Sequence, residues 1–117
     1  MLINVYGHGF SVTGGLLEQT QRQIESGFSW ASPSLRDVDV HLCDINGDHG
    51  GDDKSCMIQV RLRHGQPVVA RSIHRDMYAA IAAATAKAKK AVVRALGRRH
   101  SGRRAASVRH VFNASPA

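Results

Sequence analysis

Four basic residues in the C-terminal third of the chain recur at the spacing of an α-helix. Counting 100° per residue, they fall within an arc of about 80° on one side of a helix, and no acidic residue interrupts them. A regular row of unneutralised cations can contact successive phosphates of a nucleic acid, and we favour this interpretation over an ordinary solvated helix face. The four residues are Lys87, Lys90, Arg94 and Arg98.

The distribution of charge along the chain also indicates a polyanionic partner. Residues 1–76 carry 7 basic and 9 acidic residues, whereas residues 77–117 carry 9 basic residues and no acidic one. RNA suits this asymmetry better than an acidic membrane, because no exposed Trp or Phe accompanies the lysines of the helix. The expected RNA-binding residues are Lys87, Lys89, Lys90, Arg94, Arg98 and Arg99, with Arg22, Arg103 and Arg104 as further candidates. A second patch, on the sheet, would comprise Arg61, Arg63 and Arg71.

Acidic and histidine residues near positions 44–53 raise the question of a metal site or of hydrolysis. The segment 46–54 lacks the acid spacing and the closing glutamate of a calcium loop, so we interpret it as a solvated hairpin loop. A small hydrolase that uses this loop is the alternative. A Cys/His nucleophile would need an orienting third group, which is missing. We therefore expect no enzymatic activity, no metal, no cofactor and no small-molecule substrate. The loop residues considered are Asp44, Asn46, Asp48, His49, Asp52 and Asp53.

Apolar and polar residues alternate over residues 36–45 and 55–63, which predicts two half-buried strands. The alternation places Cys43 and Cys56 on opposite faces of the sheet, so it predicts no disulfide. The residues expected to face the core are Val38, Val40, Leu42, Cys56, Ile58, Val60 and Leu62.

The complete pattern is β-α-β-β-β-α, which predicts an α+β fold with one four-stranded sheet and both helices packed on one face. Thr13 is the expected N-cap and Gly27 the expected C-cap of the first helix, and the second helix follows Asp76 and ends at Gly97. The expected strands cover residues 2–6, 36–45, 55–63 and 68–74, and the expected helices cover residues 14–27 and 77–96. We expect one domain over residues 1–97 and a basic, disordered tail over residues 98–117.

The size and composition are those of one domain, with 117 residues of which 43% are hydrophobic. No segment resembles a secretory signal, no apolar stretch could span a membrane, and two cysteines do not make a disulfide scaffold, so we expect a soluble, cytoplasmic protein. None of the few aromatic residues forms a recognisable platform for stacking bases. We therefore expect RNA to be bound through its shape and its phosphates.

Three sequence motifs point to a known family. Asp76-Met77-Tyr78-Ala79-Ala80-Ile81 opens the second helix, and Gly7-x-x-x-x-Val12-Thr13 precedes the first. The segment Asp44-Ile45-Asn46-Gly47, continued by Gly50-Gly51-x-Asp53-Lys54-x-Cys56, is similar to one bacterial subgroup. Over about residues 2–99 the chain resembles the ribosome hibernation-promoting factors, also called ribosome-associated inhibitors or sigma-54 modulation proteins.

This resemblance implies a ribosome-binding translation inhibitor. Members of the family bind the small ribosomal subunit and its rRNA near the decoding centre, in the channel that mRNA and tRNA use. They block translation there and help to store idle ribosomes. The family's basic positions on the second helix fall on Lys87, Lys90 and Arg94.

Two features depart from the family pattern. The first helix carries Arg22 as its only cation, beside Glu18 and Glu25, whereas relatives are more basic there. The chain also lacks the additional C-terminal dimerisation domain of long members, so it resembles a short form and is expected to be monomeric when free. The alternative function is a general double-stranded RNA-binding module, a class that also ends in a three-stranded sheet and a helix with lysines.

Overall fold

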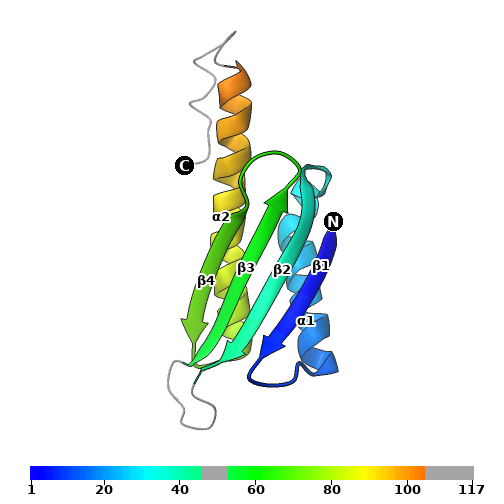
Figure 1. Cartoon of the computed structure of the whole chain (residues 1–117), viewed down its shortest axis with the longest axis vertical. Coiled ribbons are helices and arrows are strands. Elements are labelled where there is room, and N and C mark those ends of the chain that lie inside the picture. Colours follow the sequence, from blue (N-terminus) through cyan, green and yellow to red (C-terminus); the bar gives the residue numbers. More distant parts are fainter. Residues whose placement is uncertain (46–52, 105–117) are drawn as a thin grey trace.

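Figure 1 shows the computed structural model, which describes residues 1–45 and 53–104, with side chains up to residue 97. The elements follow in the order β1 (Leu2–His8), α1 (Gly14–Phe28), the 3-10 helix η1 (Ser29–Ser34), β2 (Leu35–Asp44), β3 (Lys54–Leu62), β4 (Val68–His74) and α2 (Met77–Arg104). The expected order β-α-β-β-β-α is confirmed, and η1 is a further short helix within the connection before β2.

The strands of the described residues form one four-stranded sheet in the order β1-β2-β3-β4. β1 runs parallel to β2, and the other neighbouring strands are antiparallel. The parallel pair follows from α1, because parallel neighbours need a long crossover connection, whereas a short turn suffices between β3 and β4. Both helices cover the same face of the sheet, as predicted, and the other face is open (Figure 1).

The inner face of the sheet carries the apolar rows that the alternation predicts. Val40 of β2 is paired in register with Ile58 of β3, and both side chains are fully buried. Cys56 belongs to the buried row, whereas Cys43 points to the open face, and both are free thiols. The other predicted inward residues, all buried, are Val38, Leu42, Val60 and Leu62.

The first helix begins as predicted but ends differently. The Thr13 side chain accepts a hydrogen bond from the Leu16 N–H across 3.2 Å, which caps the first turn. The expectation that Gly27 is the C-cap is wrong, because α1 runs through Phe28 into η1. Gly27 lies instead against α2, where an added Cβ would be 3.0 Å from Thr85 Cγ2. The small residue therefore allows the two helices to approach.

The second helix is longer than predicted, because it passes Gly97 and ends at Arg104. A glycine inside a helix costs only about 1 kcal/mol relative to alanine, and the strong helix formers around Gly97 offset this cost. Gly97 also lacks the positive φ of a terminating glycine, which the described chain shows only at Gly9 and Gly65. Residues 98–104 of the expected tail thus belong to α2.

Residues 105–117, the remainder of the expected tail, lie outside the described residues, so the prediction of disorder there stays a prediction. In the described ranges 1–45 and 53–104, no helix has both the length and the apolar character needed to cross a bilayer.

Candidate nucleic-acid interface

The predicted row of cations lies on the solvent side of α2. Lys87, Lys90 and Arg94, which we call the α2 ridge, are all exposed. The opposite side of the helix supplies the core with fully buried residues: Ala80, Ile81, Ala84, Ala88 and Val92. Because this side is fixed against the sheet, the ridge must face outward. Arg98 follows one helical turn after Arg94, and its backbone belongs to α2.

Lys87 lies at the border between the helix layer and the sheet. Its Nζ donates a hydrogen bond to the backbone carbonyl oxygen of Arg71 on β4, across 3.1 Å. Since β4 is an edge strand, this carbonyl is available to a side chain from the neighbouring layer. The ridge therefore begins at the edge of the sheet and continues along α2 toward Ala95, which lines a hollow with the turn between β3 and β4.

No carboxylate in the described chain compensates the ridge. The ion pairs found there involve Lys54, with Asp44 and Asp53, and Arg61, with Asp37 and Asp39. α2 itself contains no acidic residue. The positive potential of the α2 ridge is thus directed to solvent, which favours a polyanion.

The other predicted RNA-binding residues are distributed around the ridge. Lys89 is exposed one turn beyond Thr85, the residue that faces α1, so Lys89 lies on the α1 side of α2. Arg22 is exposed on α1, where it borders a polar hollow of about 280 Å³ with Gln19, Gln23 and Ser26. Arg99, Arg103 and Arg104 belong to the helical backbone of α2, but their side chains lie outside the described part.

The arginines proposed as a second patch do not form one cationic surface. Arg61 donates from Nη1 to Asp37 at 2.7 Å and pairs with Asp39 at 2.9 Å, and the hydrogen bond to Asp37 is the main cause that raises its pKa. Arg63 Nε donates to the carbonyl of Pro33, and Arg71 extends toward Met57. The structure thus separates these three side chains and neutralises the first.

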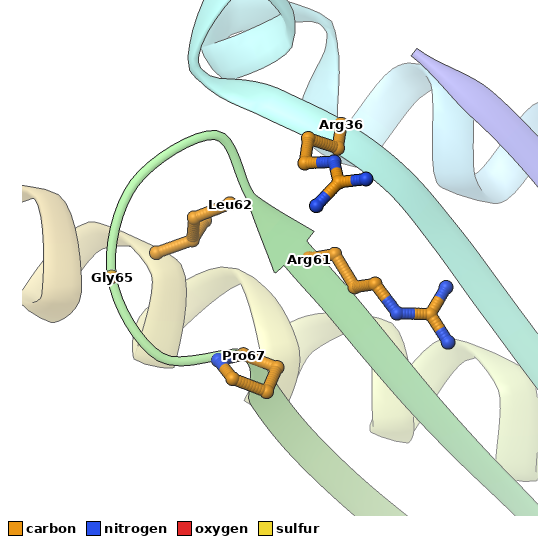
Figure 2. A pocket seen from close by; sticks show the side chains of 5 residues that line it. All are labelled: Arg36, Arg61, Leu62, Gly65 and Pro67. Carbon is orange, nitrogen blue, oxygen red and sulfur yellow. The ribbon is translucent and has the colours of Figure 1, made fainter.

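An irregularity in β2 places one further arginine near Arg61. The register shifts between Leu35 and Asp37, so Arg36 and Asp37 both lie opposite Arg61. Arg36 and Arg61 line a small hollow of about 110 Å³ with Leu62, Gly65 and Pro67 (Figure 2). The two carboxylates bound by Arg61 leave this hollow with little net charge.

The acidic segment that suggested a metal site is only partly described. Asn46, Asp48, His49 and Asp52 lie outside the described residues, and the described ones contain no cluster of three potential ligands. Asp53 is 1% exposed, and its carboxylate accepts a hydrogen bond from Lys54 Nζ across 3.2 Å. The same Nζ binds Asp44 at 3.0 Å, and this hydrogen bond is the main cause that raises the pKa of Lys54. Asp44 and Asp53, two of the residues considered as metal ligands, therefore form ion pairs with Lys54.

The sequence interpretation missed a cluster of rings on the open face of the sheet. Tyr6 of β1 stacks on His41 of β2, with ring centroids 4.9 Å apart and planes inclined by 21°. His8 Nε2 lies 2.9 Å from His41 Nδ1, so one ring nitrogen donates a hydrogen bond to the other. Part of the signal was present, because a β-α-β unit predicts parallel pairing and Tyr6 alternates with the inward residues Ile3 and Val5, but the register that pairs Tyr6 with His41 was not.

Comparisons with known proteins relate this geometry to a family. Residues 3–100 match the family model described as Sigma 54 modulation protein / S30EA ribosomal protein. No curated protein sequence matches. A ribosomal subunit interface protein from Coxiella burnetii has a similar structure, with 20% identity and a TM-score of 0.65 over 76% of this chain and 90% of that chain. The N-terminal domain of Protein Y from Thermus thermophilus is also similar, with 21% identity and a TM-score of 0.62 over 76% of this chain and 92% of that one. At these identities the structural likeness shows a common fold.

Proposed function

The chain belongs to the Sigma 54 modulation protein / S30EA ribosomal protein family of non-enzymatic, ribosome-associated factors, and we propose that it inhibits translation by binding the small ribosomal subunit through the α2 ridge. The observation that carries the proposal is the outward row of Lys87, Lys90 and Arg94, which no described carboxylate neutralises. The name of the Coxiella burnetii relative, a ribosomal subunit interface protein, supports a ribosomal partner.

The ridge suits the backbone of folded rRNA. Its residues follow at intervals of three and four, which sets the cations about one helical turn, or about 5 Å, apart along the axis of α2. Phosphates are recognised by such cations without regard to sequence, and RNA helices are read mainly through shape and backbone. We place Lys89, Arg98 and Arg99 in the same interface, with Arg22, Arg103 and Arg104 at its margins.

Inhibition would follow from occupancy. A domain bound in the channel of mRNA and tRNA near the decoding centre excludes both ligands by volume, so no chemical step and no cofactor is required. This mode of action places the protein in the cytoplasm with the ribosomes. The free protein, in this proposal, is a monomer.

The direct test is co-sedimentation of the full chain with purified small subunits through a sucrose gradient. The variant Lys87→Ala/Lys90→Ala/Arg94→Ala should keep α2 intact, because alanine is the best helix former, yet lose most of the bound fraction at moderate salt. Inhibition of translation in vitro should fall in parallel. Arg36→Ala/Arg63→Ala, which removes two cations outside the α2 ridge, serves as the control.

Two outcomes would redirect the proposal. If the triple-alanine protein co-sediments like the parent, the ridge is only a solvated helix face and the proposed site is wrong. If a generic RNA duplex competes as well as the small subunit does, the chain acts as a general double-stranded RNA-binding module.

A further inference from the structure

A row of four side chains crosses the open face of the sheet. Tyr6 of β1 is paired in register with His41 of β2, His41 with Met57 of β3, and Met57 with Arg71 of β4. Paired residues of neighbouring strands share a face, so all four side chains stand on the side that the helices leave free (Figure 1). We call these four residues the sheet row.

Contacts along the sheet row fix its rings in place. The Tyr6 ring stacks on His41 at a centroid distance of 4.9 Å, and the hydrogen bond with His8 orients the imidazole of His41 from the other side. At the opposite end, Arg71 Nη2 lies 3.9 Å from Met57 Sδ. Tyr6 is nevertheless 44% exposed, so a large part of its ring remains available to a ligand.

The charge near the row favours an anionic ligand that carries planar groups. The acidic residues of this face, Asp37 and Asp39, both form ion pairs with Arg61. Within the sheet row, Arg71 therefore carries the formal positive charge. The backbone carbonyl of Arg71 accepts a hydrogen bond from Lys87 of the α2 ridge. The sheet row is therefore continuous with the ridge around the edge of β4.

We propose that the sheet row binds unpaired bases of single-stranded RNA, with a base stacked on Tyr6 and with Arg71 and Lys87 holding phosphates. Stacking needs only a planar face, so it tolerates any base sequence. Three steps between strands span about 14 Å, and an open four-stranded sheet in RNA-recognition modules stacks two or three bases. The proposal rests on the proposed RNA-binding role of the α2 ridge and adds a second kind of RNA contact.

The test measures affinity for a fluorescein-labelled, mixed-sequence RNA 12-mer without self-complementarity, by anisotropy, as a single strand and as a duplex with its complement. Tyr6→Ala should weaken single-strand binding by about tenfold and leave duplex binding unchanged. Tyr6→Phe should bind like the parent. The matched control is Tyr78→Ala, since Tyr78 is equally exposed, at 47%, but lies at the start of α2 away from the sheet row.

The dependence on salt separates stacking from charge. Removing the neutral ring of Tyr6 should leave the slope of log K against log salt unchanged, whereas Arg71→Ala should reduce its magnitude by about 0.7 on a single strand. In the parent protein, the ring protons of His41 should shift in NMR spectra when the single strand is added. This measurement needs no variant and stays informative if Tyr6→Ala folds poorly.

The proposal is overturned if Tyr6→Ala binds the single strand within twofold of the parent, if Tyr78→Ala has the same effect, or if the His41 signals do not move. Co-sedimentation keeps it distinct from the proposed function. If Tyr6→Ala loses affinity for the single strand but the triple-alanine variant of the ridge still binds small subunits, only the proposed function is contradicted. If Tyr6→Ala keeps its affinity for the single strand but the triple-alanine variant no longer binds small subunits, only the proposal for the sheet row is contradicted.

Discussion

Lys87 of α2 donates a hydrogen bond to the backbone carbonyl of Arg71 on β4, so the first cation of the α2 ridge is anchored to the edge of the sheet. This contact protects a carbonyl of an edge strand and leaves two of the three ammonium hydrogens for a ligand. Lys90 and Arg94 are exposed, and neither forms a hydrogen bond of this kind within the part of the chain that the structure describes. The ridge thus has one cation held by the sheet edge and two whose charged groups face solvent.

The salt dependence of binding should count the phosphates that the ridge contacts. Each cation removed from it should lower the magnitude of the slope of log K against log salt by about 0.7–0.9, because fewer counterions are released. We expect this for Arg94→Ala, measured by co-sedimentation with small subunits over a series of KCl concentrations. Glu18→Gln/Glu25→Gln on α1 should not weaken binding. An unchanged slope in Arg94→Ala would mean that this residue does not touch phosphate.

The buried row of β2 should not tolerate charge. Val40 is 0% exposed, so Val40→Asp would bury a carboxylate without a partner and should lower the free energy of unfolding by several kcal/mol. Val69→Asp is the matched control, because Val69 is 56% exposed on the open face of β4 and an added charge there is solvated. Urea denaturation followed by circular dichroism compares both with the parent. Equal midpoints for the two variants would contradict the packing of β2.

The fold follows from the sequence where a local pattern decides it. Alternation across β2 and β3 identifies the buried row. The apolar side of α2 must pack against the sheet, so the α2 ridge on its other side must face solvent. Gly27 shows the limit of this reasoning. Its role depends on Thr85, a residue far along the chain, whereas a glycine near a helix end suggests only a cap.

The residues of the candidate site also differ in whether a local sequence pattern predicts their placement. Lys87, Lys90 and Arg94 belong to one helix, so their spacing alone predicts a shared surface. Tyr6 and His41 belong to strands joined by a whole helix, and the register between them is set by the packing of α1 and not by any local motif. Their stacking therefore emerges only when the sheet is assembled.

The contact of Gly27 with Thr85 should appear as a coupling free energy. Gly27→Ala alone gains about 1 kcal/mol of helix propensity but presses a methyl group against Thr85 Cγ2. Thr85→Ser removes that methyl group and retains the hydroxyl, which donates to the Ile81 carbonyl at 2.7 Å. Gly27→Ala should thus be more favourable in the Thr85→Ser background than in the parent. A double-mutant cycle of unfolding free energies with no coupling would show that the two residues do not touch.

The continuity of α2 past Gly97 can be tested with a single methyl group. Within a helix, Gly97→Ala should raise the free energy of unfolding by up to about 1 kcal/mol and increase the helical circular dichroism signal. At a left-handed helix terminus the same substitution would destabilise the protein. Ala95→Gly, two residues earlier and on the buried side, is the control and should be destabilising. A lower stability of Gly97→Ala would place the helix end where the sequence suggested it.

Cys56 should make the protein less stable at alkaline pH. Its thiol is fully buried on β3, and this burial raises its pKa from 9.0 to about 12. Between these two values the unfolded chain releases the thiol proton and the folded chain retains it, so the unfolded state is favoured progressively as the pH rises. Below pH 9 the contribution of Cys56 to stability is fully present, and it is lost as the pH rises toward 12.

The comparison of the parent with Cys56→Ala isolates this effect, because the two proteins differ only in this thiol. Between pH 8 and pH 10.5 the unfolding free energy of the parent should fall by about 2 kcal/mol more than that of Cys56→Ala, as the linkage of one buried thiol requires. Urea unfolding under reducing conditions at the two pH values gives both quantities. Parallel pH profiles would show that the Cys56 thiol ionises as readily in the folded protein as in the unfolded chain, and would contradict its burial beneath the helices.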